Sequence, residues 1–173
     1  MKPEELARCL REAGAVERCH TLPHCGSYTV GQHSFDALSL LLVLHPDPTV
    51  DLIKAVLWHD VAERWTGDVP AVAKWDDPEL GRLLDQLEAR IFAKLGIPHV
   101  VLLSKSDHQW LEAVDKLELW LWAKSQLRMG NENATVVLEN LGRWFDANEV
   151  PPAVIKLMCQ YEETRVDGLL RSA

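Results

Sequence analysis

Apolar residues recur every three to four positions along most of the chain, which is the spacing of one face of an α-helix. Proline, glycine and short polar stretches interrupt this pattern and mark where helices end. We predict helices over about residues 4–13, 30–45, 51–65, 78–95, 107–127, 134–147 and 151–169, where the third begins at Thr49 or Asp51. No stretch of useful length shows the period of two that a β-strand requires. The pattern therefore predicts an all-α fold.

Capping residues mark several of the predicted helix starts. Thr29 precedes the second helix, and Gln32 follows it at the spacing of a capping box. Pro78 fits the first turn of the fourth helix, where its missing N–H costs nothing. Ser106 or Asp107 is placed to cap the fifth helix.

The composition is that of one globular domain. The chain has 173 residues, of which 47% are hydrophobic and 25% are charged. It contains no internal repeat and no low-complexity linker. We therefore predict a single domain over residues 1–173, a bundle of about six or seven helices whose apolar faces pack on a shared core.

The charge narrows the classes of partner. The chain has 18 Lys and Arg against 26 Asp and Glu, a formal net charge of −8. Stable nucleic-acid binding needs a basic surface, so we expect none here. An anionic small-molecule substrate is compatible with this charge, because a bound metal ion can reverse the field inside one pocket. No apolar run approaches the roughly 18 residues that span a membrane, and we expect no membrane insertion.

The first residues and the cysteines favour a reducing compartment. Residues 1–5 lack the basic and apolar regions of a secretory signal. The four cysteines, Cys9, Cys19, Cys25 and Cys159, form no CxxC pair and suggest no disulfide framework. We expect the protein to act in the cytoplasm, which for a phage protein is the cytoplasm of the host.

The most informative chemistry lies in residues 58–63. His59 and Asp60 are adjacent on a predicted helix that is otherwise mostly apolar. Imidazole and carboxylate groups are suitable ligands for a divalent transition metal. Glu63 follows His59 by four residues and Asp60 by three, so it lies beside them on the helix surface. It is therefore placed to reach a water at such a metal without being a ligand.

His33 and Asp115 extend this set to two histidines and two aspartates. His33 lies early in the second predicted helix, and Asp115 flanks an apolar stripe in the fifth. A carboxylate in a protein interior needs a cation or several hydrogen bonds. Each residue also has a simpler interpretation: His33 as a surface or helix-end residue, and Asp115 as the partner of Lys116 or Lys124 on a solvated face. The full set would leave coordination positions open for water and a substrate oxygen.

In an all-α chain, this set resembles the ligands of the HD-domain metal-dependent phosphohydrolases. Residues 29–34, around His33, are similar to the first-histidine segment of the bacterial 5′-deoxynucleotidase branch of that superfamily. Residues 58–70, which run from the His-Asp pair to Gly-Asp-Val-Pro, are similar to its second segment. Arg18, fifteen residues before His33, matches an arginine of the same branch. The similarity extends over about residues 18–124.

The resemblance implies a role for each of these residues. Four of them, His33, His59, Asp60 and Asp115, would bind one divalent transition metal, with cobalt, manganese and zinc as the candidates. Arg18 would hold the substrate phosphate, for which a planar guanidinium is well matched.

Three further residues receive roles from the same resemblance. Glu63 would position or activate the nucleophilic water and assist proton transfer. Asp68 would lie near the sugar or the attacked phosphate. Lys74 follows the Gly-Asp-Val-Pro turn and would bind additional phosphate oxygens.

The implied activity is hydrolysis of the 5′-linked phosphate of a deoxynucleotide. The substrate would be a monophosphate, which gives deoxynucleoside and phosphate, or a triphosphate, which gives deoxynucleoside and triphosphate. A dATP-specific triphosphohydrolase, as in short phage members of the branch, is the alternative, and the family tends to form dimers or larger homo-oligomers. Two departures leave the base and sugar preference open: Cys19 stands where the branch commonly has Trp, and Gln32 where it commonly has an acidic residue.

The sequence alone leaves three other interpretations open. Cys19-His20 and His24-Cys25 suggest a structural zinc knuckle, although the spacing is tighter than in zinc fingers, and the alternative is a polar loop over the pocket mouth. A nucleotide-binding regulatory HD protein without turnover belongs to another functional class. A helical interaction protein whose seven tryptophans form a partner surface is a third.

Overall fold

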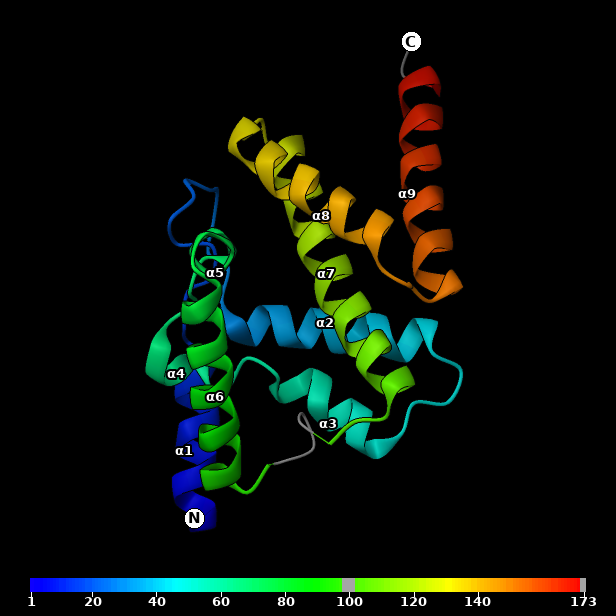
Figure 1. Cartoon of the computed structure of the whole chain (residues 1–173). Helices are drawn as coiled ribbons and strands as arrows, with labels where there is room; N and C mark the ends of the chain where they lie inside the picture. The colour runs from blue at the N-terminus through cyan, green and yellow to red at the C-terminus, as the bar shows by residue number, and fades with distance from the viewer. Residues whose placement is uncertain (98–101, 172–173) are drawn as a thin grey trace.

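The computed structural model describes residues 1–97 and 102–171. Within these residues, the chain forms nine α-helices and one short 3-10 helix (Figure 1): α1 Pro3–Ala13, α2 Val30–Leu44, α3 Val50–Trp58, α4 Glu63–Thr66, α5 Ala71–Asp76, α6 Pro78–Leu95, α7 Lys105–Arg128, η2 Glu132–Ala134, α8 Thr135–Ala147 and α9 Pro152–Arg171. The β-type pairing in this part of the chain is an isolated bridge between Glu17 and Thr29. The prediction of an all-α fold is confirmed.

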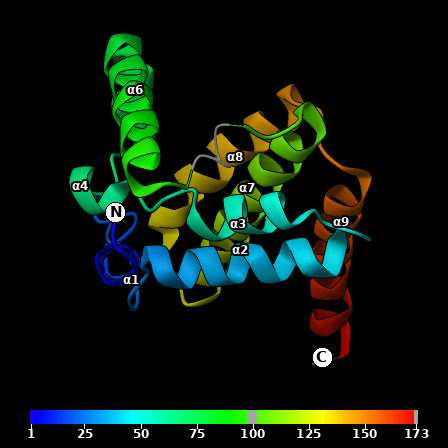
Figure 2. The same cartoon turned by 90° about the horizontal axis from the view of Figure 1, so that it is seen from below.

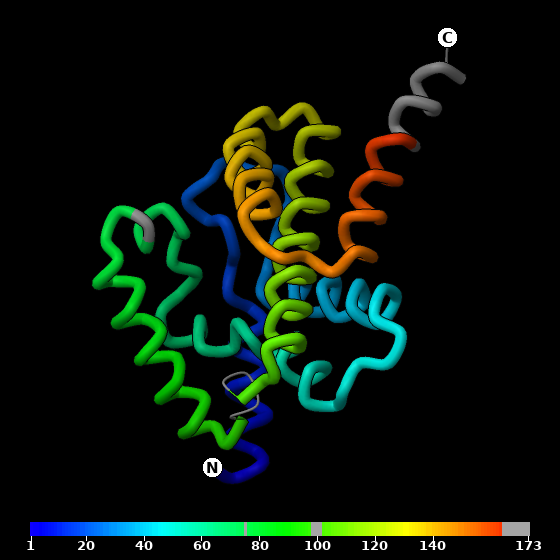
Figure 3. Tube along the Cα trace, turned by 45° about the vertical axis from the view of Figure 1, so that its right-hand side comes forward, coloured from blue at the N-terminus to red at the C-terminus, as the bar shows by residue number. Residues whose placement is uncertain are grey.

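The long helix α7 is at the centre of the fold. It contacts α2, α3, α8 and α9, and it crosses α2 (Figure 1). Seen from below, α3 runs beside α2 (Figure 2). The helices α1, α4, α5 and α6 lie together on the other side, where α5 packs on α6 and α1 contacts α4. The loop between α1 and α2 passes between these two groups (Figure 3).

Apolar clusters pack the helices of each group against one another. One cluster joins α2, α3 and α7 through fully buried side chains that include Leu41, Leu52 and Val114. A second joins α7, α8 and α9 around Leu117. A third joins α1 and α6 to the segment after α3, where Val61 and Ala62 are buried. The end of α3 is therefore fixed between the middle of α7 on one side and α6 on the other.

The third predicted helix is wrong in its second half. We predicted a continuous helix over residues 51–65, but α3 ends at Trp58 and the short α4 starts at Glu63. The imidazole Nδ1 of His59 lies 2.8 Å from the carbonyl oxygen of Val56 and donates to it. The last carbonyls of a helix have no partner within that helix. The His59 side chain satisfies one of them, so the helix ends at this residue, which also carries candidate chemistry.

The predicted caps are partly confirmed. The hydroxyl of Thr29 accepts a hydrogen bond from the backbone N–H of Gln32 at 3.3 Å, as the capping signal indicates. Pro78 lies in the first turn of α6, with Asp77 as its cap. The cap of α7 is Ser104, not Ser106 or Asp107, because the Ser104 hydroxyl accepts from the backbone N–H of Asp107 at 3.1 Å.

A close backbone contact fixes the start of α2 against the end of α1. The N–H of Gly31 donates to the carbonyl oxygen of Gly14 at 3.0 Å. A Cβ atom on Gly31 would lie 2.9 Å from that same oxygen, nearer than real Cβ atoms approach. Glycine at this position therefore lets α2 begin directly beside α1.

Helix α5 lies in a stretch for which we predicted no helix, directly after Pro70. No helix in the described part of the chain combines the length and the apolar character needed to cross a bilayer.

Candidate metal centre

Three helices bring the four predicted ligands to one place. His33 lies in the first turn of α2, His59 and Asp60 follow the end of α3, and Asp115 lies in the middle of α7. The His33 side chain is completely buried, and those of the other three are 11–16% exposed. The interpretation of His33 as a surface residue is therefore wrong. Asp115 faces the interior even though it also forms an ion pair with Lys116 at 2.6 Å.

The ligand atoms lie close together. The Nε2 atoms of His33 and His59 are 3.1 Å apart. The Oδ1 of Asp115 lies 3.1 Å from the Nε2 of His33 and 3.7 Å from that of His59. The Oδ2 of Asp60 lies 3.2 Å from the Nε2 of His59 and 3.6 Å from that of His33. The ligand atoms of His33, His59 and Asp60 all lie within 4.8 Å of one another, close enough to hold one metal ion.

When the two imidazoles are neutral, the partners of their Nδ1 atoms leave both Nε2 atoms free. The Nδ1 of His59 donates to the carbonyl oxygen of Val56, and the Nδ1 of His33 contacts a carboxylate oxygen of Glu118. A neutral imidazole carries one proton, so each Nε2 presents a lone pair to the other and to two carboxylates. Such a set of acceptors repels itself unless a cation lies among them. Two imidazoles and two carboxylates therefore fit a divalent transition metal.

Arg18 is a second cation, besides Lys116, that the chain places beside this set. Its guanidinium is buried and forms an ion pair with the Oδ2 of Asp60. Further contacts reach the Oε1 of Glu63 at 3.8 Å and the Oδ1 of Asp115 at 3.9 Å. Arg18 thus shares its carboxylate partners with the proposed metal, and its Nε is buried without a hydrogen-bond partner.

The charges in this set shift the pKa values in opposite directions. Burial alone would raise the pKa of Asp60, yet the charges of His59 and Arg18 hold it well below its usual range. Burial would likewise raise the pKa of Asp115, but Lys116 and the histidines hold it low. Burial alone would lower the pKa of His59, but Asp60 and Asp115 raise it well above its usual value. The carboxylates thus favour the protonated form of His59, and a cation bound by its Nε2 would replace that proton.

Glu63 differs from the ligand carboxylates. Burial, and next the charge of Asp60, raise the pKa of Glu63 to about 9, against the opposing effect of Arg18. Its Oε2 is buried and has no hydrogen-bond partner. A buried carboxyl group with a strongly raised pKa beside a candidate metal site is suited to proton transfer.

The structure places Asp68 against the loop between α1 and α2, which contains Arg18 and is called the Arg18 loop below. Its Oδ2 accepts a hydrogen bond from the backbone N–H of Cys19 at 2.6 Å and lies 4.0 Å from the Nδ1 of His20. Cys19 has a φ of 52°, the left-handed conformation that residues other than glycine rarely adopt. The Asp68 carboxylate therefore secures the residue next to Arg18, and its predicted role near the sugar stays a prediction.

Lys74 lies in α5. It acts by charge on Glu88 of α6, lowering a pKa that burial and the charge of Asp60 raise. Glu88 and Lys74 therefore lie on the α5–α6 side of the site. The predicted contact of Lys74 with phosphate stays a prediction.

The comparisons with known proteins concern the fold. No protein-family model and no curated protein sequence matches this chain. The HD phosphohydrolase DatZ of cyanophage S-2L, solved with dA and one catalytic Zn²⁺ ion, aligns with 95% of this chain and 96% of its own at a TM-score of 0.66 and 21% identity. The chain has the HD-domain fold.

Two archaeal structures share this HD-domain fold. The PH0347 protein of Pyrococcus horikoshii OT3 aligns with 91% of this chain and 96% of its own, at a TM-score of 0.73 and 20% identity. A conserved hypothetical protein of Pyrococcus furiosus aligns with 94% of this chain and 98% of its own, at a TM-score of 0.64 and 18% identity. Because nearly the whole length of each chain is covered, the shared feature is the complete helical arrangement. The resemblance to HD-domain phosphohydrolases that the motifs indicate is thereby confirmed for the fold.

One side chain at the site was missed in the sequence. Glu118 is only 5% exposed and contacts the Nδ1 of His33. It follows Asp115 by three residues on α7, so both carboxylates project from the same face of that helix. This spacing was the available signal, but Glu118 resembles an ordinary surface glutamate until the path of α2 is known.

The zinc-knuckle interpretation of residues 19–25 has no support in the HD-domain structure. Cys25 is exposed, and its backbone N–H and carbonyl pair with the side-chain amide of Gln126 at 2.8 and 2.9 Å. The His24 ring packs edge-on against Trp122 at a centroid distance of 5.5 Å. Within the residues that the structure describes, this segment forms no group of metal-ligating side chains. It is a loop secured to the end of α7.

Proposed function

We propose that this protein is a divalent-metal-dependent phosphohydrolase that acts on deoxynucleotides. The observation that carries the proposal is the convergence of two imidazole Nε2 atoms and two aspartates beside a buried arginine. The HD-domain fold supports it, because DatZ has this fold and was solved with dA and a catalytic Zn²⁺ ion.

The proposed ligands are His33, His59, Asp60 and Asp115. A divalent ion held by them would lower the pKa of a water molecule and withdraw electron density from a phosphoryl oxygen. Arg18 would turn from Asp60 to the substrate phosphate and offset the charge that repels an anionic nucleophile.

Glu63 is the proposed proton-transfer group. In the reaction, the water oxygen forms a bond to phosphorus, and the bond between phosphorus and the deoxyribose 5′-oxygen breaks. The water loses a proton, and the leaving 5′-oxygen gains one. Glu63 lies 3.8 Å from Arg18 and has a raised pKa, so it is suited to exchange protons with both oxygens. Asp68 would hold the Arg18 loop, and Lys74 would bind further phosphate oxygens.

The two candidate substrates differ in what leaves. A deoxynucleoside monophosphate would give deoxynucleoside and phosphate, and attack at the α-phosphate of a triphosphate would give deoxynucleoside and triphosphate. The likeness to DatZ, which was solved with dA, favours a test of adenine deoxynucleotides and of a dATP-specific triphosphohydrolase. A regulatory HD protein that binds nucleotides without turnover is the alternative from another class.

The test compares Glu63→Gln with a matched variant on α7. Protein freed of metal by a chelator receives Co²⁺, Mn²⁺ or Zn²⁺ together with dAMP, dATP and the other deoxynucleotides, and the products are separated by chromatography. We expect release of deoxynucleoside with phosphate or triphosphate only when metal is restored. Glu63→Gln should bind metal as before and lose about 10²- to 10⁴-fold in turnover.

The control is Glu112→Gln, whose half-exposed side chain faces His108 on the surface of α7. It should retain full activity. Absence of product with every metal would remove the enzyme proposal and leave the regulatory one. Full activity of Glu63→Gln would refute the role of Glu63 alone.

A further inference from the structure

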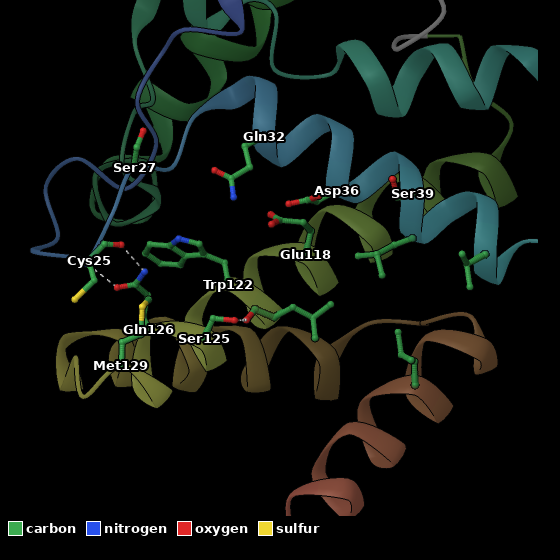
Figure 4. Close-up of a pocket in the computed structure, with 14 residues that line it drawn as sticks. Cys25, Ser27, Gln32, Asp36, Ser39, Glu118, Trp122, Ser125, Gln126 and Met129 are labelled. Atoms are coloured by element: carbon green, nitrogen blue, oxygen red, sulfur yellow. Dashed lines mark hydrogen bonds between the residues drawn. The ribbon is translucent and has the colours of Figure 1, made fainter.

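Glu118 is a buried carboxylate whose placement calls for an explanation. Its side chain projects from α7 toward α2, next to a cavity of about 590 Å³ that Asp36 also lines (Figure 4). Only 5% of Glu118 is exposed. An ionised carboxylate is costly to bury unless strong donors satisfy it.

Two donors meet at one oxygen of Glu118. The Oε2 atom accepts a hydrogen bond from the hydroxyl of Tyr28, and the same atom contacts the Nδ1 of His33. An ionised carboxylate only accepts hydrogen bonds, so the proton of this contact lies on Nδ1. The Nε2 of His33 is then a lone pair directed at the candidate metal centre.

The partners of Glu118 are themselves held in place. Tyr28 is completely buried, and its ring stacks on Trp122 with centroids 4.6 Å apart and planes 16° from parallel. The backbone carbonyl of Tyr28 accepts from the N–H of Arg18 at 2.7 Å. A displacement of Glu118 would therefore disturb a packed aromatic pair as well as a histidine.

We propose that Glu118 is a positioning residue that fixes His33 in its Nδ1–H form and thereby increases the affinity of the site for a divalent cation. This inference rests on the proposed metal-dependent function. A carboxylate behind a ligating imidazole orients the ring and makes its free nitrogen more basic. Glu118 acts through His33 and touches neither substrate nor metal.

The two histidines differ in their support. The Nδ1 of His59 donates to a neutral carbonyl at the end of α3, whereas the Nδ1 of His33 faces a negative charge. His33 is therefore the more strongly polarised of the two ligands. Removal of Glu118 should weaken metal binding and should leave the arrangement around His59 intact.

The first experiment measures Co²⁺ affinity of the full chain by the visible absorption of the bound ion. We expect Glu118→Ala to weaken binding by about 10- to 100-fold and Glu118→Gln by less, because its amide oxygen still accepts from Nδ1. The control is Asp36→Asn, which removes another carboxylate that lines the same cavity. This variant should bind Co²⁺ like the unaltered protein. Circular dichroism checks that each variant is folded.

The second experiment needs no metal, and its decisive measurement is made on the unaltered protein. Nitrogen NMR of ¹⁵N-histidine-labelled, metal-free protein reports which nitrogen of His33 carries the proton. We expect Nδ1–H in the unaltered protein and a mixture of both forms in Glu118→Gln.

Two results would overturn the inference: a His33 that carries its proton on Nε2 in the unaltered protein, or Co²⁺ affinity unchanged in both Glu118 variants. These results are distinct from failure of the proposed function, in which the unaltered protein hydrolyses no deoxynucleotide with any metal.

Discussion

Replacement of Arg18 by Ala should have opposite effects on metal binding and on hydrolysis. Arg18 pairs with Asp60, a proposed ligand, and also lies near Glu63 and Asp115. A metal ion must compete with this guanidinium for Asp60. Arg18→Ala should therefore bind the metal more tightly, while it loses the group proposed to hold the phosphate.

The size of both effects follows from the geometry. Opposite unit charges about 4 Å apart attract by about 1 kcal/mol in water and about 4 kcal/mol at the effective dielectric constant of a protein site. The Arg18 side chain is 9% exposed and its acidic partners 14–16%, so the lower value is a minimum. Loss of Arg18 should raise metal affinity about fivefold or more. Loss of a donor to a developing oxyanion costs about 10²- to 10³-fold in turnover, and we expect a fall of that order.

The assay pairs Co²⁺ titration with deoxynucleotide hydrolysis at saturating metal. Arg18→Lys retains the charge but not the planar fork, so it should bind metal like the unaltered protein and hydrolyse poorly. Arg64→Ala is the matched control, because Arg64 forms an ion pair with Glu12 and lies over the ring of Trp65 outside the cluster. A parallel loss of metal affinity and activity in Arg18→Ala would show that Arg18 supports the ligands and does not compete with the metal.

Two further predictions test the electrostatics and the packing. The pKa of His59 is raised above its ordinary 6.5, so protons should compete with a metal ion for this imidazole. The affinity for Co²⁺ should therefore fall as the pH is lowered from about 8 to about 6. Equal affinity across this range would contradict the proposal that His59 is a metal ligand. Gly31→Ala should lower the free energy of unfolding by about 1–3 kcal/mol, because its Cβ would lie 2.9 Å from a backbone oxygen. A Cβ atom at Gly142 would have no neighbour within 4 Å, so Gly142→Ala should instead raise the free energy of unfolding by about 0.5–1 kcal/mol. Urea titrations measure both variants, and equal values would refute the close contact at Gly31.

The fold class and the ligand types could be predicted because they depend on local patterns. Apolar spacing identified the long helices, and Thr29 marked the start of α2 through a hydrogen bond within its own turn. His59 and Asp60 are adjacent in the chain, so any backbone path leaves them together. The break after Trp58 was missed because the His59 side chain takes a carbonyl partner that periodicity does not reveal.

By itself, the sequence determined that the chain is helical and that it carries imidazole and carboxylate groups suited to a metal. Only the tertiary structure decided that His33 is buried, that Asp115 faces it at 3.1 Å, and that Arg18 shares their partners. It alone revealed Glu118 behind His33. The physical reason is that helix periodicity specifies which face of each helix is apolar, whereas the contact of one helix with another specifies which polar groups lose water together. The metal-binding chemistry of a buried set of hydrogen-bond acceptors can be inferred only once that packing is known.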